Sequence, residues 1–272
     1  EGTPAEAAGI KPKDQIIQID GRSTKDMIVQ EAVQLLRGRK GTKVTVTVRR
    51  PGQDKPLVFT LVRDNIEVKS VKSELLENGI GYIKLAQFQE ESSLELHNAL
   101  ESLERQNGGG LNGIVLDLRN NPGGLLSEAI EIVDEFIDNG LIVSVKWRAD
   151  SQSRDYYASR NNQFQKEPLI VMVNDGSASA SEVVAEALQD NKRATILGTK
   201  TFGKGSVQTI IKLDDGSGLK LTTAKFYAPS GRSISEVGLT PDVVVNDSEA
   251  DDLQLNRALN LLNSQTLSKT VP

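Results

Sequence analysis

The sequence contains no cysteine and only one histidine among its 272 residues. The absence of cysteine excludes disulfides and thiolate metal sites, and a single histidine argues against a zinc centre. A net charge of −5 argues against nonspecific binding to nucleic acid. No apolar run approaches the ~20 residues that would cross a bilayer. With 38% apolar residues, the chain can still bury a sizeable core in one or two domains.

The clearest local signal is a segment of small residues between a strand pattern and a helix pattern. The apolar run 168–173 is followed by Asn-Asp-Gly-Ser-Ala-Ser-Ala-Ser-Glu at 174–182 and then by apolar residues at helical spacing. This pattern places Ser179 at a helix N-terminus, where the macrodipole and free amides stabilise negative charge, so the serine could act as a nucleophile. Ser179 and Glu182 also match a capping box, which would only start the helix. The segment alone leaves both interpretations open.

A serine nucleophile needs a base, and the single histidine is a poor candidate. His97 lies beside the apolar stripe of a predicted helix, which favours a solvated position. Lys204 is flanked by Gly203 and Gly205, and a lysine can act as a base when a desolvated site keeps it neutral. Gln208 lies four positions further along a predicted strand, on the same side, and could orient the amine. By itself, a lysine beside glycines is more typical of a solvated loop.

Three motifs together resemble one family of proteases. They are Ser-Ala-Ser-Ala-Ser-Glu at 177–182, Phe-Gly-Lys-Gly-Ser-Val-Gln at 202–208 and Asp-Leu-Arg-Asn-Asn-Pro-Gly-Gly at 117–124. Their order and spacing are similar to those of the C-terminal processing peptidases, also called tail-specific proteases. The resemblance extends from residue 1 to about Val245. It implies an α/β protease core of the crotonase-like kind that works without a metal or a cofactor.

The resemblance also implies a role for each residue of these motifs. Ser179 would be the nucleophile, Lys204 would be the general base, and Gln208 would position the lysine. The oxyanion would be held by backbone amides from two of the motifs, namely those of Ala180 and of Gly123 or Gly124.

The first 63 residues resemble a bacterial PDZ domain, through the motifs at 2–10, 14–21 and 36–42. Such domains bind an extended peptide C-terminus by strand addition beside a helix. We expect this one to be partial, because the first strands and the carboxylate-binding loop of the family would precede Glu1. Arg37 could couple the PDZ domain to the protease, or it could simply provide a positive charge at the C-terminus of its helix.

Two nucleotide-binding motifs are nearly matched. Residues 108–113 spell G-x-G-x-x-G, but they follow a helix and precede a strand, the reverse of the dinucleotide fingerprint, and therefore predict a turn. Residues 198–204 resemble a P-loop, but Gly205 replaces the required Ser or Thr and a strand pattern follows in place of a helix. Neither segment indicates nucleotide binding.

Periodicity divides the chain into alternating elements. It predicts helices over 27–37, 93–106, 125–137, 183–190 and 251–262, and strands over 15–19, 43–48, 57–62, 81–85, 113–118, 168–173, 194–197, 207–213 and 219–226. Residues 148–166 predict a long polar loop, which is either an excursion near the active site or a plain solvated loop.

We therefore predict a partial PDZ domain over 1–63, a serine protease core over 64–246, and a C-terminal helix and tail over 247–272. The predicted function is a serine endopeptidase that cleaves proteins near their C-terminus, with PDZ-gated recognition of apolar tails. The alternative is a non-catalytic protein that binds a peptide or an apolar ligand on the same fold. An adaptor protein and a homo-oligomer stay open as partners. The family implies an extracytoplasmic location, such as the bacterial periplasm or cell envelope, with any targeting segment outside this chain.

Overall fold

The structure, a computed structural model, describes residues 3–66, 69–147, 153–159, 164–213, 217–233, 235, 237–246 and 252–270. The chain folds into two compact units, Glu1–Val68 and Lys69–Pro272. Among the described helices, none combines the length and the apolarity needed to cross a membrane.

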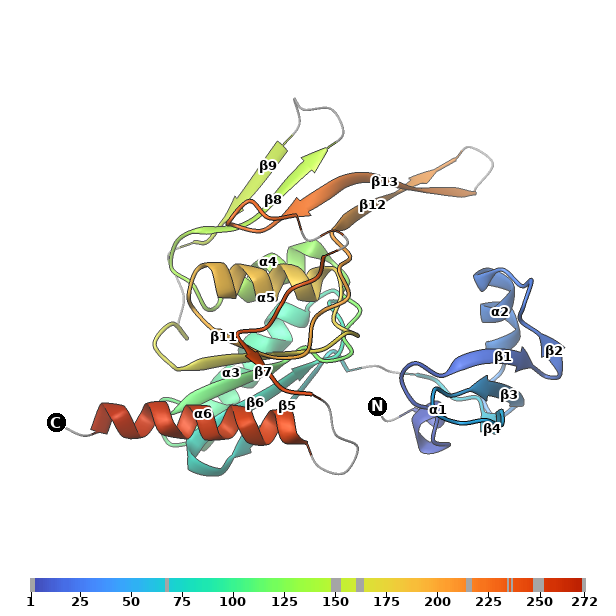
Figure 1. The fold of residues 1–272 in the computed structure, drawn as a ribbon, viewed down its shortest axis with the longest axis horizontal. Coiled ribbons are helices and arrows are strands. Elements are labelled where there is room, and N and C mark those ends of the chain that lie inside the picture. The colour runs from blue at the N-terminus through green and yellow to red at the C-terminus, as the bar shows by residue number, and fades with distance from the viewer. Residues whose placement is uncertain are drawn as a thin grey trace. The chain divides into compact units, whose positions relative to one another are not determined.

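The first unit is a small antiparallel sheet with two helices (Figure 1). Its strands lie in the order β2-β1-β3-β4, and its elements are α1 (Pro4–Ala7), β1 (Gln15–Ile19), β2 (Arg22–Ser23), α2 (Val29–Leu36), β3 (Lys43–Arg49) and β4 (Leu57–Val62). Every second residue of β3 is buried, namely Val44, Val46 and Val48, as a strand with one face on a core requires. The period-two pattern predicted for this strand is therefore confirmed.

The second unit is built around a six-stranded sheet in the order β14-β11-β10-β7-β6-β5. Its strands are β5 (Val71–Leu76), β6 (Ile80–Leu85), β7 (Gly113–Asp117), β10 (Leu169–Val173), β11 (Thr195–Gly198) and β14 (Val243–Val244). All neighbouring pairs are parallel except β5 and β6, which form an antiparallel hairpin through the 3-10 turn η1 (Glu77–Gly79). The carboxyl ends of β7, β10 and β11 therefore lie at the same edge of the sheet.

Helices cover both faces of this sheet (Figure 1). They are α3 (Ser92–Gln106), α4 (Leu126–Asp134), α5 (Ala180–Asp190) and α6 (Leu253–Thr270). The odd-numbered residues of Leu169–Val173 belong to the core that α3, α4 and α5 cover, while Ile170 and Met172 pack in a second core with Ala258 and Leu262 of α6. Because β10 is buried on both faces, its sequence is a continuous apolar run.

A third sheet lies beyond α4 and α5 in Figure 1. Its strands are in the order β12-β13-β8-β9, with β8 (Leu141–Trp147), β9 (Ser153–Tyr157), β12 (Ser206–Lys212) and β13 (Gly218–Tyr227). The prediction of a loop over 148–166 is wrong for β9, which pairs antiparallel with β8 and packs Tyr156 against the core. Residues 148–152 and 160–163 of that segment lie outside the described part.

Two of the interpretations of glycine-rich segments are confirmed. Residues 107–110 form a turn between α3 and β7, and the segment after Gly198 leads into the strand β12 instead of a helix. The terminal helix is longer than predicted, since α6 extends to Thr270, and β2, β5 and β14 were missed because they are short or rich in charged residues.

Candidate active site

Three serines surround the start of α5, and their environments differ. Ser177 is buried, and its Oγ donates to the Leu118 carbonyl at 2.8 Å. Ser181 is also buried, and its Oγ donates to the Asn121 carbonyl at 2.9 Å. Both hydroxyls therefore hold the start of α5 against the end of β7. Ser179 is only half-buried, so it is the serine of the three whose side chain a substrate can reach.

Ser179 has a backbone conformation that is unfavourable for a residue with a Cβ. Its φ is 57° and its ψ is −115°, and such a conformation costs on the order of 1–3 kcal/mol. The next residue, Ala180, is the first of α5, and the N–H of a first helical residue has no acceptor within the helix. The strained backbone thus presents the serine beside an amide that has no acceptor within the helix, at the positive end of that helix.

Glu182 is completely buried, and its carboxylate accepts four hydrogen bonds. Oε2 accepts from the N–H of Ser179 at 2.9 Å and from the N–H of Lys204 at 2.8 Å. Oε1 accepts from the hydroxyl of Thr201 at 2.5 Å and from the N–H of Gly203 at 2.7 Å. The predicted capping box is therefore present. The same carboxylate also joins the backbones of Ser179 and Lys204, the two residues predicted to form a catalytic Ser/Lys dyad.

The loop that carries Lys204 lies between β11 and β12. The Lys204 side chain is half-buried, and Gly203 has a φ of +92°, a conformation that favours glycine. Gln208 lies in β12, where it pairs with Thr222 just after a shift in register. Its side chain is outside the described part, so its role in positioning the lysine stays a prediction.

The glycine turn after β7 lies directly against the serine. Gly123 has a φ of +98°, and a Cβ there would come within 2.7 Å of the Ala178 carbonyl oxygen and 2.8 Å of the Ser179 Cβ. Only glycine fits such an approach. The N–H of Gly123 already donates to Oδ1 of Asn121 at 2.9 Å. Gly124 is therefore the stronger of the two candidates for the second oxyanion donor.

An arginine–aspartate cluster lies at the end of β7, just before this turn. Arg119 donates to Asp117 at 2.6 Å and to both carboxylate oxygens of Asp252 at 2.7 and 2.8 Å. Tyr82 donates to the same Asp117 carboxylate at 2.7 Å, and burial together with that negative charge raises the pKa of the phenol. Sequence reasoning missed this cluster, because Asp252 is 133 residues away from Arg119.

His97 lies in α3, where its ring is placed between two carboxylates. Its Nδ1 lies 3.0 Å from Oε1 of Glu135, and its Nε2 lies 3.5 Å from Oε1 of Glu101. The histidine side chain is 32% exposed between these carboxylates, which agrees with the predicted, partly solvated position on a helix. The described residues include no group of three or more His, Cys, Asp or Glu side chains that could hold a metal ion.

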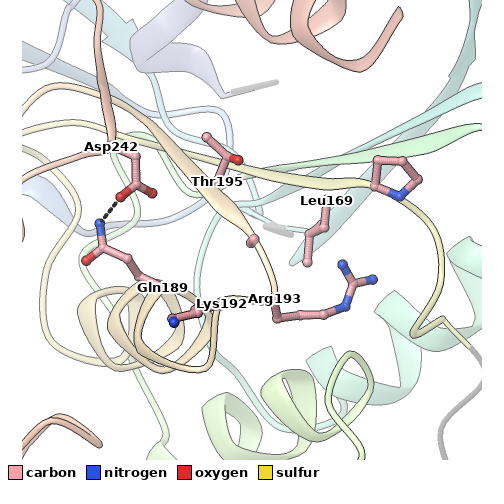
Figure 2. A pocket seen from close by; sticks show the side chains of 8 residues that line it. Leu169, Gln189, Lys192, Arg193, Thr195 and Asp242 are labelled. Atoms are coloured by element: carbon pink, nitrogen blue, oxygen red, sulfur yellow. Dashed lines mark hydrogen bonds between the residues drawn. The ribbon is translucent and has the colours of Figure 1, made fainter. Parts of the chain in front are cut away.

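A polar pocket of about 400 Å³ is lined by residues of β10, β11 and α5 (Figure 2). It lies at the start of β10, whereas Ser179 follows the end of that strand. Its walls include Leu169 and Thr195, which start β10 and β11. Gln189 donates to Asp242 at 2.8 Å, and Arg193 donates to the carbonyls of the surrounding loops. The side chains of Gln189 and Arg193 therefore hold neighbouring segments of the protein together through these hydrogen bonds. Ligands of parallel sheets bind at the carboxyl ends of strands, so this pocket is not part of the candidate site.

In the first unit, the C-terminus of α2 is capped by a residue that sequence reasoning did not single out. Arg37 occupies the C-cap position as predicted, but it is exposed. The last carbonyls, those of Leu35 and Leu36, accept from the guanidinium of Arg63 at 2.8 Å. The role of Arg37 in coupling the PDZ domain to the protease stays a prediction.

Comparison with protein families identifies both units. The family model of peptidase family S41 matches residues 79–245, which include both dyad candidates and the glycine turn. The chain belongs to peptidase family S41. A model of the PDZ domain matches residues 1–50. The resemblance that the three motifs predict is therefore confirmed.

Several S41 relatives are similar over most of this chain. A carboxy-terminal-processing protease of Bartonella bacilliformis is 48% identical over 246 residues, which cover 90% of this chain and 56% of that protein. The processing protease CtpA of Bacillus subtilis is 43% identical, covering 89% of this chain and 51% of that protein. The chain thus spans about half the length of these curated relatives.

The fold agrees with a solved structure. A photosystem II D1 C-terminal processing protease is 34% identical with a TM-score of 0.79, and the match covers 96% of this chain and 70% of that one. The chain therefore has the mixed α/β fold of an S41 peptidase combined with a PDZ region.

Proposed function

We propose that this S41 chain is the catalytic part of a serine endopeptidase that cleaves proteins near their C-terminus. The names and similarity of its relatives support this activity. The structural observation that supports this activity most strongly concerns Oε2 of Glu182, which accepts hydrogen bonds from the N–H of Ser179 and from the N–H of Lys204. Nucleophile and base thus start from two backbone positions that one carboxylate holds together.

The proposed mechanism uses groups of the chain alone. Neutral Lys204 takes the proton from the Ser179 hydroxyl as the oxygen attacks a peptide carbonyl. The amides of Ala180 and Gly124 hold the oxyanion, and Gln208 orients the lysine. The protonated lysine then gives its proton to the leaving amine, and water hydrolyses the acyl-enzyme. This scheme involves no metal or cofactor.

We propose that the substrates are proteins with apolar C-terminal tails, which the PDZ region recognises before cleavage. The exposure of apolar side chains on and beside α2 supports this, with Ile28 59% and Val29 75% exposed. PDZ domains bind a peptide terminus beside such a helix. We also propose that the core is of the crotonase-like class and that the protein acts outside the cytoplasm, in the bacterial periplasm or cell envelope. An adaptor protein or a homo-oligomer is compatible with this function.

The test is cleavage of an unfolded protein with an apolar C-terminal tail, measured against pH with a chelator present. We expect the Ser179→Ala and Lys204→Ala variants to lose activity, and we expect the chelator to have no effect. Lys200→Ala is the matched control, because Lys200 is an exposed lysine of the same loop and should leave the rate unchanged. Activity that survives in Ser179→Ala would assign the nucleophile elsewhere. A wild type that binds tails without cutting them would favour the non-catalytic binding protein.

A further inference from the structure

The lysine loop, residues 199–205 between β11 and β12, contacts the start of α5 mainly through the buried side chain of Glu182. One backbone bond adds to this contact, since the N–H of Phe202 donates to the Ser177 carbonyl at 3.1 Å. Three of the four hydrogen bonds that Glu182 accepts come from this loop, from Thr201, Gly203 and Lys204. A helix cap requires only the fourth bond, from the N–H of Ser179. The additional bonds therefore serve the position of the loop and not the start of the helix.

Thr201 extends this attachment to a third segment. Its hydroxyl donates to Glu182 Oε1 at 2.5 Å and accepts from the N–H of Leu239 at 2.7 Å. The N–H of Thr201 also donates to the Leu239 carbonyl at 3.1 Å. Thr201 and Leu239 are both buried, so water does not compete for these bonds.

We infer that Glu182, with Thr201, is a positioning latch that holds the lysine loop against the serine; this inference rests on the proposed Ser179–Lys204 dyad. A carboxylate suits this role because it accepts hydrogen bonds on both oxygens and donates none. Bonds from amides to a buried carboxylate are also stronger than bonds between neutral groups. A glutamine in its place would have an NH₂ group where one carboxylate oxygen accepts two hydrogen bonds, so both of those bonds would be lost.

Burial in α5 does not by itself require such bonds. Glu186 lies one turn further along the same helix and is also buried, yet its Oε2 has no hydrogen-bond partner among the described residues. Glu186 therefore provides a matched control, since Glu186→Gln makes the same chemical change in the same helix at a side chain with no hydrogen bond to the lysine loop among the described residues.

The experiment compares Glu182→Gln, Thr201→Val, Thr201→Ser and Glu186→Gln in the peptidase assay. Moving reacting groups by about 1 Å costs on the order of 100-fold in rate, so we expect a loss in kcat of this size for Glu182→Gln, with KM unchanged. Thr201→Val removes one of the four hydrogen bonds to Glu182, and we expect kcat to fall roughly tenfold, which corresponds to about 1.4 kcal/mol in the activation free energy. Thr201→Ser should restore the rate, because it keeps the hydroxyl. Glu186→Gln should retain full kcat.

Amide hydrogen exchange separates a latch from a general loss of structure. In Glu182→Gln we expect faster exchange in peptides that contain Gly203 and Lys204, with unchanged exchange in α3 and α4. If Glu182→Gln does not fold, the Thr201 pair decides. A kcat within twofold of wild type in folded Glu182→Gln, or equal rates in Thr201→Val and Thr201→Ser, would overturn the latch.

Hydrogen exchange can test the latch even if the proposed Ser179–Lys204 dyad is wrong. Activity that survives in Ser179→Ala would refute the dyad. The latch would then be judged by exchange alone: unchanged protection of Gly203 and Lys204 in Glu182→Gln would refute it, and selective loss of protection would support it.

Discussion

Glu186 gives the protein a pH-dependent stability that one substitution should remove. Glu186 is 3% exposed, and its Oε2 has no hydrogen-bond partner in the part of the chain that the structure describes. Burial raises the pKa of Glu186 to about 7; the nearby Arg232 opposes this, while Asp190 and Glu182 add to it. At neutral pH and above, the folded protein therefore contains a buried carboxylate that the fold stabilises poorly.

The pH dependence of the free energy of unfolding follows from the difference between the pKa values of Glu186 in the folded and unfolded chain. Between pH 4.5 and about 7, folded Glu186 holds a proton that the unfolded chain has released, so the free energy of unfolding falls as pH rises through this range. At 1.36 kcal/mol per pKa unit, the loss is about 3 kcal/mol, complete above the folded pKa. Glu186→Gln cannot ionise, so its stability should not fall in this way.

Urea unfolding at pH 5 and pH 8 measures this difference. Trp147 is the only tryptophan of the chain and lies in β8, so its fluorescence reports on the protease unit. Relative to wild type, we expect Glu186→Gln to gain about 2.5 kcal/mol between pH 5 and pH 8, because pH 5 already lies above the unfolded pKa of 4.5. Glu95→Gln, at an exposed position of α3, is the control and should follow wild type at both pH values. Parallel stability profiles for wild type and Glu186→Gln would refute the reasoning.

Three further substitutions test the geometry of the site. Gly123→Ala should lower kcat by about 100-fold, because the added Cβ would displace the backbone on both sides of Ser179. The control for backbone strain in the same assay is Gly231→Ala, because Gly231 has a similar positive φ but open space around it. Ser179→Gly should be more stable to urea than Ser179→Ala, by about 1 kcal/mol or more, because glycine relieves the strain at a φ of 57°; equal stability would contradict the strain. Asp252→Ala removes the side chain that caps α6 and pairs with Arg119, and should destabilise the protease unit by about 1 kcal/mol in the same unfolding assay, whereas Asp252→Asn should keep most of the cap.

The sequence was most informative where one physical constraint determines the pattern. The strands β1 and β4 have the predicted bounds, because apolar runs and turn residues delimit them clearly. The strand β9 could not be predicted, since Ser153–Tyr157 has no alternation of apolar and polar residues beyond Tyr156, and it becomes a strand by pairing with β8. Short edge strands such as β14 likewise depend on their neighbour in the sheet.

In the candidate site too, features set by the local sequence could be predicted, whereas features that depend on distant segments could not. Ser179 could be proposed from the strand–turn–helix pattern, and Lys204 from its glycines and the family motif. The reason that Ser177 and Ser181 are structural became visible only in three dimensions, because their acceptors, the carbonyls of Leu118 and Asn121, lie about 60 residues earlier in the chain. The capping box identified Glu182, but its three other donors come from a segment about 20 residues later.

These contacts also explain how the fold maintains a strained serine. The carbonyl of Ser179 accepts from two amides of α5, its N–H donates to Glu182, and Gly123 packs against its Cβ. The first two constraints come from α5 and the third comes from the glycine turn after β7, so relaxing the serine backbone would break contacts to both segments. A cost of 1–3 kcal/mol is sustained in this way at functional sites. Because the positions of the proposed nucleophile, Ser179, and the proposed base, Lys204, depend on the same buried carboxylate, loss of that carboxylate should reduce activity more than it reduces the stability of the sheet behind it.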